Sequence, residues 1–400
     1  MVRRNGGFIG TDGLDAPDPP TGVAGTAGNA SVSVAFTAPT DAGTSAITGF
    51  VAQVSTNDTA YSAGSNTGTS SPIVVSSLTN DTAATAKVWA INAYGTSAPS
   101  NASASFTPSN PIALFMGGGS GRVASIDRIS MISAGDATDF GDLRAATDQC
   151  GALSSKTRGL LAGGRASATP SNVIEQVTFG TTGSGTDFGD LTVARRGGPQ
   201  GVSSTTRGVF ICGRPSSGST SNVMDYVTIA SAGDATDFGD ANVARGFMGS
   251  GGASNGTRGV TGGGELGEEN TDSIEYITIA NTGNGTDFGN LSAAKDDLTI
   301  CSNTTRGIFF GGRTSDAINV IEYITIANTG NVTDFGNLTS STQDGSSAAS
   351  STLAICGAVG GAVNIDQVTI ATTGNATDFG DLLVARVQIA GGCSNAHGGL

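Results

Sequence analysis

Short runs of alternating apolar and polar residues recur along most of the chain. Alternation with a period of two is typical of a β-strand with one buried face. No long stretch shows the 3.6-residue apolar period of an amphipathic helix, so the pattern predicts an all-β protein. The clearest runs are NVIEQVTF (172–179), NVMDYVTI (222–229), DSIEYITI (272–279) and NVIEYITI (319–326).

These runs belong to a repeat whose most constant element is the motif TDFG, found six times at intervals of 44 to 50 residues. An apolar segment ending in glycine precedes each alternating run, and a Gly/Ser-rich stretch follows each TDFG segment. Four strand-length segments per repeat predict one four-stranded blade of a β-propeller. The Gly-rich stretch suits the innermost strand, where backbones must approach closely. The TDFG phenylalanines are Phe140, Phe188, Phe238, Phe288, Phe335 and Phe379.

The two ends of the repeat region are offset against the repeat. The segment 112–118 reads as the second strand of a blade, whereas 387–400 matches a first strand and its turn. We therefore expect the last segment to pair with the strand that begins at Ile112, which removes an open sheet edge. This arrangement predicts a six-bladed propeller over residues 112–400.

The repeat resembles that of the kelch family, whose blades carry a glycine pair after an apolar strand and then an acidic–aromatic step. The pair is seen at Gly163–Gly164 and the step at Glu275–Tyr276, while the phenylalanine of TDFG takes the place of the usual tryptophan. Two copies have a cysteine, Cys212 or Cys356, as the first member of the pair. The resemblance implies the propeller architecture and leaves the function open.

Residues 17–108 contain a different set of short strands, separated by Gly, Asn, Ser and Pro turns. The segments SVSVAF (31–36), ITGFVAQV (47–54) and LTNDTAATAKVWAINAYGTSAPS (78–100) resemble a fibronectin type III domain, as does the Pro19–Pro20 pair. Ala84 stands where that family has the aromatic residue of its corner. We expect a β-sandwich that acts as a spacer or docking module, a linker at 109–111, and a docking or disordered segment at 1–16.

Charge and composition narrow the functional classes. The net charge of −14 disfavours a nucleic-acid surface or an anionic membrane as partner. No stretch approaches the length of a membrane span, and the first residues lack the apolar core of a Sec signal peptide. The five cysteines are odd in number and widely spaced, so we expect free thiols and assembly in a reducing cytoplasm.

The residues needed for catalysis are scarce. His397 is the only histidine, and the GxSxG motif of a nucleophile elbow is absent. One histidine and five tyrosines also disfavour copper oxidase chemistry. We therefore expect a protein that is not an enzyme and has no cofactor.

The TDFG turn contains carboxylates that could suggest calcium. The segment DATDFGD (136–142) recurs at 234–240, but other copies lack the first or last carboxylate. We expect the aspartate of TDFG to cap the turn and its phenylalanine to anchor the blade. Calcium remains the alternative.

A carboxylate occurs once per repeat in the alternating run, at Asp127, Glu175, Asp225, Glu275, Glu322 and Asp366. Four repeats also have a TRG arginine, at Arg158, Arg207, Arg258 and Arg306. We expect these arginines to pair with the carboxylates as part of the scaffold.

The loop between the second and third strands of each repeat varies most among the six copies. All six loops should emerge on one face, and loops on a rigid scaffold are common sites of recognition. Two interpretations are open: unconstrained surface, or contact with a host glycan or a neighbouring subunit. The candidate binding residues are Arg122, Arg165, Arg214, Glu265, Glu268, Glu269 and Arg313.

The GFIG segment near the N-terminus, and TDFGDL-type repeats joined to a fibronectin type III domain, resemble virion structural proteins of bacteriophages. The resemblance implies a tail, fibre or decoration protein in the virion, assembled in the host cytoplasm and present in many copies, with a homo-oligomer allowed. Its partners would be other virion proteins and a host-surface glycan or protein. The alternative is a secreted bacterial adhesin or extracellular matrix or filament protein.

Overall fold

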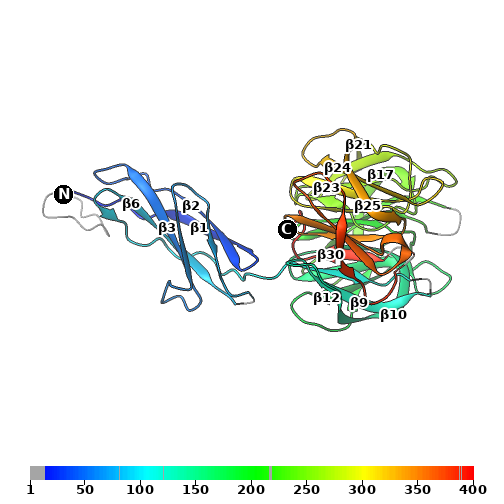
Figure 1. The fold of residues 1–400 in the computed structure, drawn as a ribbon, viewed down its shortest axis with the longest axis horizontal. Helices are drawn as coiled ribbons and strands as arrows, with labels where there is room; N and C mark the ends of the chain where they lie inside the picture. Colours follow the sequence, from blue (N-terminus) through cyan, green and yellow to red (C-terminus); the bar gives the residue numbers. More distant parts are fainter. Residues whose placement is uncertain (1–13, 81, 120, 216–218, 387, 389) are drawn as a thin grey trace. The chain divides into compact units, whose positions relative to one another are not determined.

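The computed structural model describes residues 14–400 except 81, 120, 216–218, 387 and 389. The chain forms two compact units, Met1–Asn110 and Pro111–Leu400, each with its own strands (Figure 1). Most of the expected docking segment, residues 1–13, lies outside the described residues.

The first unit contains two antiparallel sheets, with strand orders β1-β2-β5 and β4-β3-β6-β7. The alternation seen in the sequence buries one face of each sheet, so that Val34 in one sheet and Val54 in the other belong to a single core. Phe36 and Phe50 meet in this core with ring centroids 4.7 Å apart. The strands are β1 (Thr21–Gly28), β2 (Ser31–Thr37), β3 (Ile47–Ser55), β4 (Gly64–Gly68), β5 (Ile73–Ser76), β6 (Thr85–Asn92) and β7 (Gly95–Thr96).

The second unit begins with a seven-stranded antiparallel sheet of order β13-β12-β11-β10-β9-β8-β30. Its long strand β10 belongs to two groups of four, since its first part pairs with β9 and its last part with β11. The strands are β8 (Ile112–Met116), β9 (Val123–Ser130), β10 (Thr138–Ser154), β11 (Arg158–Arg165), β12 (Val173–Thr178), β13 (Thr186–Asp190) and β30 (Gly391–Ser394).

Four further four-stranded antiparallel sheets follow in chain order, each formed by consecutive strands. They are β14 (Gln200–Ser203) to β17 (Thr236–Arg245), β18 (Ala253–Ser254) to β21 (Thr286–Asn290), β22 (Thr299–Ser302) to β25 (Thr333–Thr342), and β26 (Ser346–Ala349) to β29 (Thr377–Asp381). Their inner members are β15 (Arg207–Gly213), β16 (Ser221–Thr228), β19 (Arg258–Gly262), β20 (Ser273–Thr278), β23 (Arg306–Phe310), β24 (Ile318–Thr325), β27 (Leu353–Gly357) and β28 (Asn364–Thr369). The short 3-10 helix η1 (Val359–Gly361) lies between β27 and β28. The prediction of an all-β fold is confirmed.

Backbone hydrogen bonds link these six groups in a closed cycle. The N–H of Gly183 donates to the oxygen of Phe140 at 2.8 Å, and the same bond recurs from each group to the next. The cycle closes where the N–H of Gly135 donates to the oxygen of Phe379 at 2.8 Å. Each TDFG phenylalanine is only 2% exposed, so the predicted anchoring role of this residue is confirmed.

The pairing expected between the two ends of the repeat region is also confirmed. Strand β30 pairs antiparallel with β8, and Cys393 lies opposite Leu114. The Gly-rich first strands pack backbone against backbone, because a Cβ added at Gly201 would lie 2.2 Å from the oxygen of Ala152. The predicted role of glycine in this close approach is therefore confirmed.

Candidate functional site

Buried ion pairs join consecutive sheets of the second unit. In each, a basic residue that follows the TDFG segment meets the carboxylate of the third strand in the next sheet. These side chains are nearly or fully inaccessible, so the pairs belong to the scaffold. The pairs are Arg195–Asp225 (2.8 Å), Arg245–Glu275 (3.3 Å), Lys295–Glu322 (2.6 Å) and Arg386–Asp127 (2.6 Å).

The expectation that the TRG arginines pair with these carboxylates is wrong. Each of these arginines begins a second strand, and its guanidinium instead donates to a backbone oxygen of the following sheet. Arg158 donates to the oxygen of Ile229 at 2.7 Å, and Arg306 donates to the oxygen of Ile370 at 2.9 Å. The guanidinium groups of Arg207, Arg258 and Arg306 also lie over tyrosine rings of their own sheets. The bonds to backbone oxygens therefore fasten neighbouring sheets without an acidic partner.

Two of the six carboxylates have no such cation. The position occupied by Arg195 in one repeat holds Thr147 and Thr342 in two others. The carboxylates facing these threonines are Glu175 and Asp366, and burial raises the pKa of each. Backbone N–H groups of Arg144 and Thr339 donate to these two carboxylates, as that of Asn242 donates to Glu275, which also has a cation.

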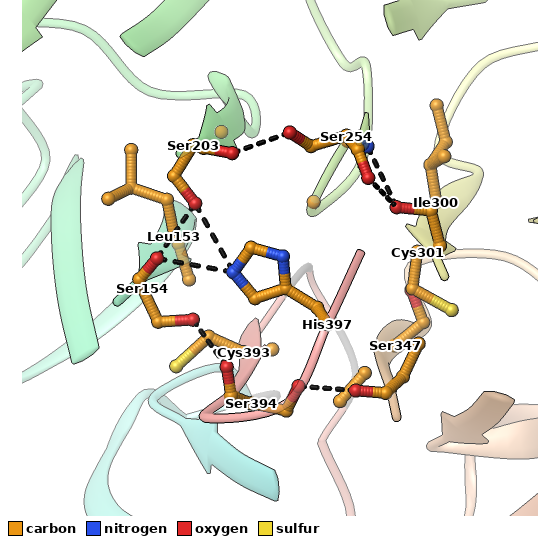
Figure 2. A pocket seen from close by; sticks show the side chains of 18 of the residues that line it. Leu153, Ser154, Ser203, Ser254, Ile300, Cys301, Ser347, Cys393, Ser394 and His397 are labelled. Atoms are coloured by element: carbon orange, nitrogen blue, oxygen red, sulfur yellow. Dashed lines mark hydrogen bonds between the residues drawn. The ribbon is translucent and has the colours of Figure 1, made fainter. Parts of the chain in front are cut away.

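The first strands of all six groups surround a central cavity of about 30 Å³ (Figure 2). Serine side chains line it in a regular way, since the hydroxyl of Ser203 donates to the oxygen of Ser154 at 2.8 Å and equivalent bonds follow around the cavity. A space of this size accommodates one or two water molecules, whereas ligand pockets are on the order of 300–1,000 Å³. The cavity therefore does not accommodate a metabolite or a sugar.

His397 closes one end of this cavity (Figure 2). Its Nδ1 accepts a hydrogen bond from the N–H of Gly399 at 3.0 Å, so the proton of the neutral ring is on Nε2. The Nε2 atom lies 3.2 Å from the oxygen of Ser154 and 3.3 Å from the hydroxyl of Ser203. Burial lowers the pKa of His397 to about 4. Both ring nitrogens thus have structural partners.

At the other end of the cavity, the chain segments that lead into the Gly-rich first strand of each group form a ring. We call this ring the mouth. Its six positions are Gln149, Gly198, Phe247, Asp297, Asp344 and Gln388. All six have positive φ, between 47° and 69°, although five are not glycine. Backbone bonds join neighbours around the ring, for example from the N–H of Asp344 to the oxygen of Asp297 at 3.0 Å.

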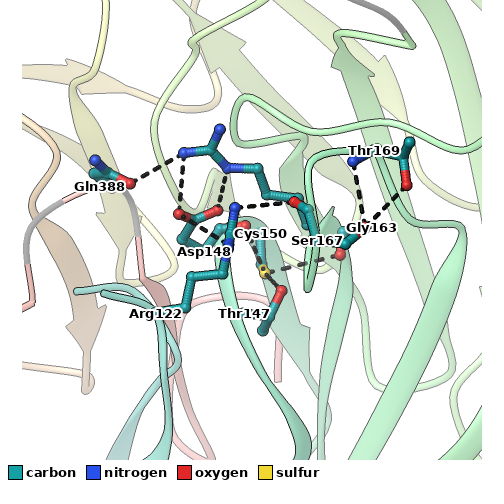
Figure 3. Close-up of polar contacts among 9 residues, drawn as sticks. Arg122, Thr147, Asp148, Cys150, Gly163, Ser167, Thr169 and Gln388 are labelled. Carbon is teal, nitrogen blue, oxygen red and sulfur yellow. Dashed lines mark hydrogen bonds and ion pairs between the residues drawn. The ribbon is translucent and has the colours of Figure 1, made fainter. Parts of the chain in front are cut away.

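Two predicted binding residues, Arg122 and Arg165, contact the carboxylate of Asp148 beside the mouth. Figure 3 shows Arg122 next to Asp148. Arg165 contacts this carboxylate at 2.7 Å and also donates to the side-chain oxygen of Gln388 at 3.2 Å. Arg122 lies 3.6 Å from Asp148 and donates to the oxygen of Ser167 in the neighbouring loop at 2.9 Å. The structure thus brings the first two variable loops together.

Arg214 and Glu265, from the third and fourth variable loops, form an ion pair of 2.7 Å. The guanidinium of Arg214 also lies 4.5 Å from the ring centroid of Phe247. Glu268 and Glu269 are exposed at the tip of the fourth loop, away from this pair.

Arg313, in the fifth variable loop, contacts Asp296 at 2.5 Å and Asp297 at 3.4 Å. Its backbone oxygen accepts a hydrogen bond from the side chain of Asn270 in the fourth loop at 2.9 Å. The predicted arginines therefore lie around one opening, and each of the four is already engaged by a carboxylate.

Sequence reasoning missed several residues of the mouth. Phe247 is the one aromatic side chain among the six ring positions, and it comes from the connection between two sheets rather than from a variable loop. Asp297 and Asp344 also lie in such connections. The repeated positive φ of these positions is not visible in the sequence, because only Gly198 marks it.

The two ring carboxyls have unusual protonation equilibria. Burial, together with the nearby carboxylates of Asp344 and Asp296, raises the pKa of Asp297 well above its ordinary value. Burial likewise raises the pKa of Asp344 to about 6, although Arg313 opposes this shift. Burial lowers the pKa of Arg196, and the nearby guanidinium groups of Arg165 and Arg214 lower it further.

The TDFG segments begin strands such as β10 and β13 rather than turns, and in two repeats an earlier aspartate makes a hydrogen bond between sheets. Asp136 and Asp234, three residues earlier, accept hydrogen bonds from the backbone N–H groups of Asp381 and Asp190 in adjacent sheets at 3.1 and 3.0 Å. Among the described residues, no group of three or more His, Cys, Asp or Glu side chains is arranged to hold a metal ion.

The five cysteines are buried and unpaired. Burial raises the thiol pKa of Cys150, Cys301 and Cys393 to about 12 in each case, so these thiols are poor nucleophiles.

No helix in the described part of the chain is long and apolar enough to cross a membrane. No protein-family model matches the chain, and no curated protein matches it.

Proposed function

We propose that residues 112–400 form a six-bladed β-propeller of kelch type and residues 17–108 a fibronectin type III-like sandwich. Six four-stranded groups linked in a cycle support the propeller. The pairing of β30 with β8 supports closure of the ring by the last strand. Two facing sheets around one core support the sandwich.

We infer that the protein is a non-enzymatic structural protein of a bacteriophage virion. Its N-terminal part docks to the particle and its propeller is displayed for host-surface adsorption or for decoration. One observation carries this proposal: charged residues of five loops that vary among the repeats lie beside the mouth on an otherwise repetitive scaffold. A scaffold that holds variable loops at one opening is suited to recognition.

The same geometry disfavours an enzyme. The single histidine has both ring nitrogens engaged by backbone and serine groups, and the buried cysteines have raised pKa values. The central cavity of about 30 Å³ is too small for a substrate. Adsorption through many copies needs only weak individual contacts, because their contributions combine.

Immunogold electron microscopy of intact particles with antibody against residues 112–400 tests the proposal. Label at tail tips or fibres is expected for adsorption, and label over the head or tail tube is expected for decoration. Absence of label from every particle, with protein found outside the cells, would overturn the virion proposal in favour of a secreted adhesin or matrix protein.

A further inference from the structure

The mouth contains buried polar atoms without hydrogen-bond partners among the described residues. The side-chain oxygen of Gln149 and one carboxylate oxygen of Asp297 are such acceptors, and Nε of Arg214 is such a donor. Gln149 is 9% exposed, Asp297 4% and Arg214 8%. Buried polar groups are nearly always hydrogen-bonded, so this arrangement indicates a site completed by another molecule.

These atoms include both donors and acceptors, and they belong to residues of the mouth or of the loops beside it. The Nε atom of Arg196 is a further donor, and Arg196 interacts electrostatically with Arg165, Arg214 and Asp148. The carboxyl of Asp344 interacts electrostatically with Arg313 in the fifth variable loop and with Asp148 in β10. A ligand that both donates and accepts hydrogen bonds satisfies such a set.

Charge further restricts the ligand. The five arginines around the mouth face five carboxyl groups, all named in the preceding section, so the charges balance to within the protons that the raised pKa values let Asp297 and Asp344 keep. Such a mouth has no strong excess of one sign, whereas phosphates and polyamines bind where one sign of charge clearly prevails. Hydroxyl groups fit the balance, because each is a donor and an acceptor without charge.

Phe247 adds an apolar surface at the same place. Its side chain is half-buried, and the guanidinium of Arg214 lies 4.5 Å from its ring centroid. Its backbone oxygen accepts a hydrogen bond from the N–H of its ring neighbour Asp297 at 2.8 Å, and its φ is 47°. An apolar ring beside convergent polar groups is the usual composition of a small-ligand site.

We propose that the mouth binds a neutral saccharide, with its hydroxyl groups on Gln149, Asp297 and the arginines and an apolar face of a sugar ring on Phe247. This rests on the proposed function, since it identifies the host-surface component as a neutral glycan. We expect a low affinity per copy, which suits a protein displayed in many copies.

A saccharide array carrying neutral, sialylated, sulfated and phosphorylated oligosaccharides, probed with the full-length protein, tests the proposal. Binding to neutral oligosaccharides is expected, and the best of them is then titrated against variants. Phe247→Asn and Gln149→Gly remove the recognition groups while keeping residue types that tolerate positive φ. Each should weaken binding at least tenfold.

Tyr94→Asn is the matched control, because Tyr94 is an aromatic residue 50% exposed in the first unit. It should leave binding unchanged, and thermal unfolding should confirm that all three variants are folded. Binding confined to acidic saccharides, no binding to any saccharide, or full binding by both folded mouth variants would each overturn the proposal.

The array result and the particle-labelling result are independent. Neutral-saccharide binding without particle label keeps the site and rejects the virion role. Particle label without saccharide binding keeps the virion role and rejects the site.

Discussion

The guanidinium of Arg195 and the carboxylate of Asp225 lie 2.8 Å apart, with both side chains inaccessible to solvent. One belongs to the end of one sheet and the other to the third strand of the next. Removal of one partner leaves the other charge buried without compensation, which is among the most destabilising single changes.

Arg195→Met should therefore lower the free energy of unfolding by about 3–5 kcal/mol, measured by urea denaturation. The control is Arg144→Met, which removes an exposed ion pair with Asp187 and should cost at most about 1 kcal/mol. Equal losses in the two variants would contradict the scaffold role of the buried pair.

Gly201→Ala should destabilise the second unit by about 1–3 kcal/mol or more, because the added Cβ would lie 2.2 Å from the oxygen of Ala152. Gly183→Ala provides the comparison, since a Cβ at Gly183 has no atom within 4 Å. Thermal or urea unfolding of the two variants separates crowding of the first strands from a general effect of glycine replacement. A stable Gly201→Ala protein would show that these strands can move apart.

The ring carboxyl of Asp344 should make stability depend on pH. Its pKa in the folded protein is about 6, above the ordinary value for aspartate, so the folded state binds the proton more tightly than the unfolded state. The resulting stabilisation is complete at low pH and is lost as the pH rises through about 6.

Unfolding free energies of the wild-type protein and Asp344→Asn between pH 4 and pH 8 measure this effect. The variant should lose less stability than the wild type as the pH rises, while Asp316→Asn, in an exposed loop, should follow the wild type. Identical profiles for wild type and Asp344→Asn would show that this carboxyl does not carry the shift.

His397 should remain neutral well below the ordinary pKa of histidine, because burial lowers its pKa to about 4. Its contribution to stability is present above the ordinary pKa and is lost as the pH falls through about 4. Since the chain has one histidine, its ring resonances in an NMR titration are assigned without ambiguity. A midpoint near 6.5 would mean that the ring is open to solvent.

Much of the strand arrangement could be predicted because the alternation of apolar and polar residues within each repeat indicates its strands. Alternation in 222–229 predicts the half-buried strand β16, and the offset between 112–118 and 387–400 predicts the pairing of β8 with β30. Such features depend on neighbouring residues or on comparison of one copy with another, both of which are visible in the sequence.

The side-chain partners were harder to predict, since they depend on the geometry between sheets. Each repeat offers two basic residues for one carboxylate, and spacing alone does not distinguish Arg207 from Arg195 as the partner of Asp225. Only the structure shows that Arg195 ends beside Asp225 while Arg207 reaches the oxygen of Ile279. Phe247 was missed for a related reason: its importance comes from its position in the ring, not from the loop pattern.

The pairing of β30 with β8 has a consequence for the order of folding. The strand at the start of the second unit meets its partner only when residues 391–394 have been synthesised, so the first sheet remains without one neighbour during most of translation. Contacts this distant in sequence slow folding, and an uncovered strand edge invites pairing between chains. A variant in which residues 391–394 cannot pair with β8 should therefore aggregate more readily than the wild type.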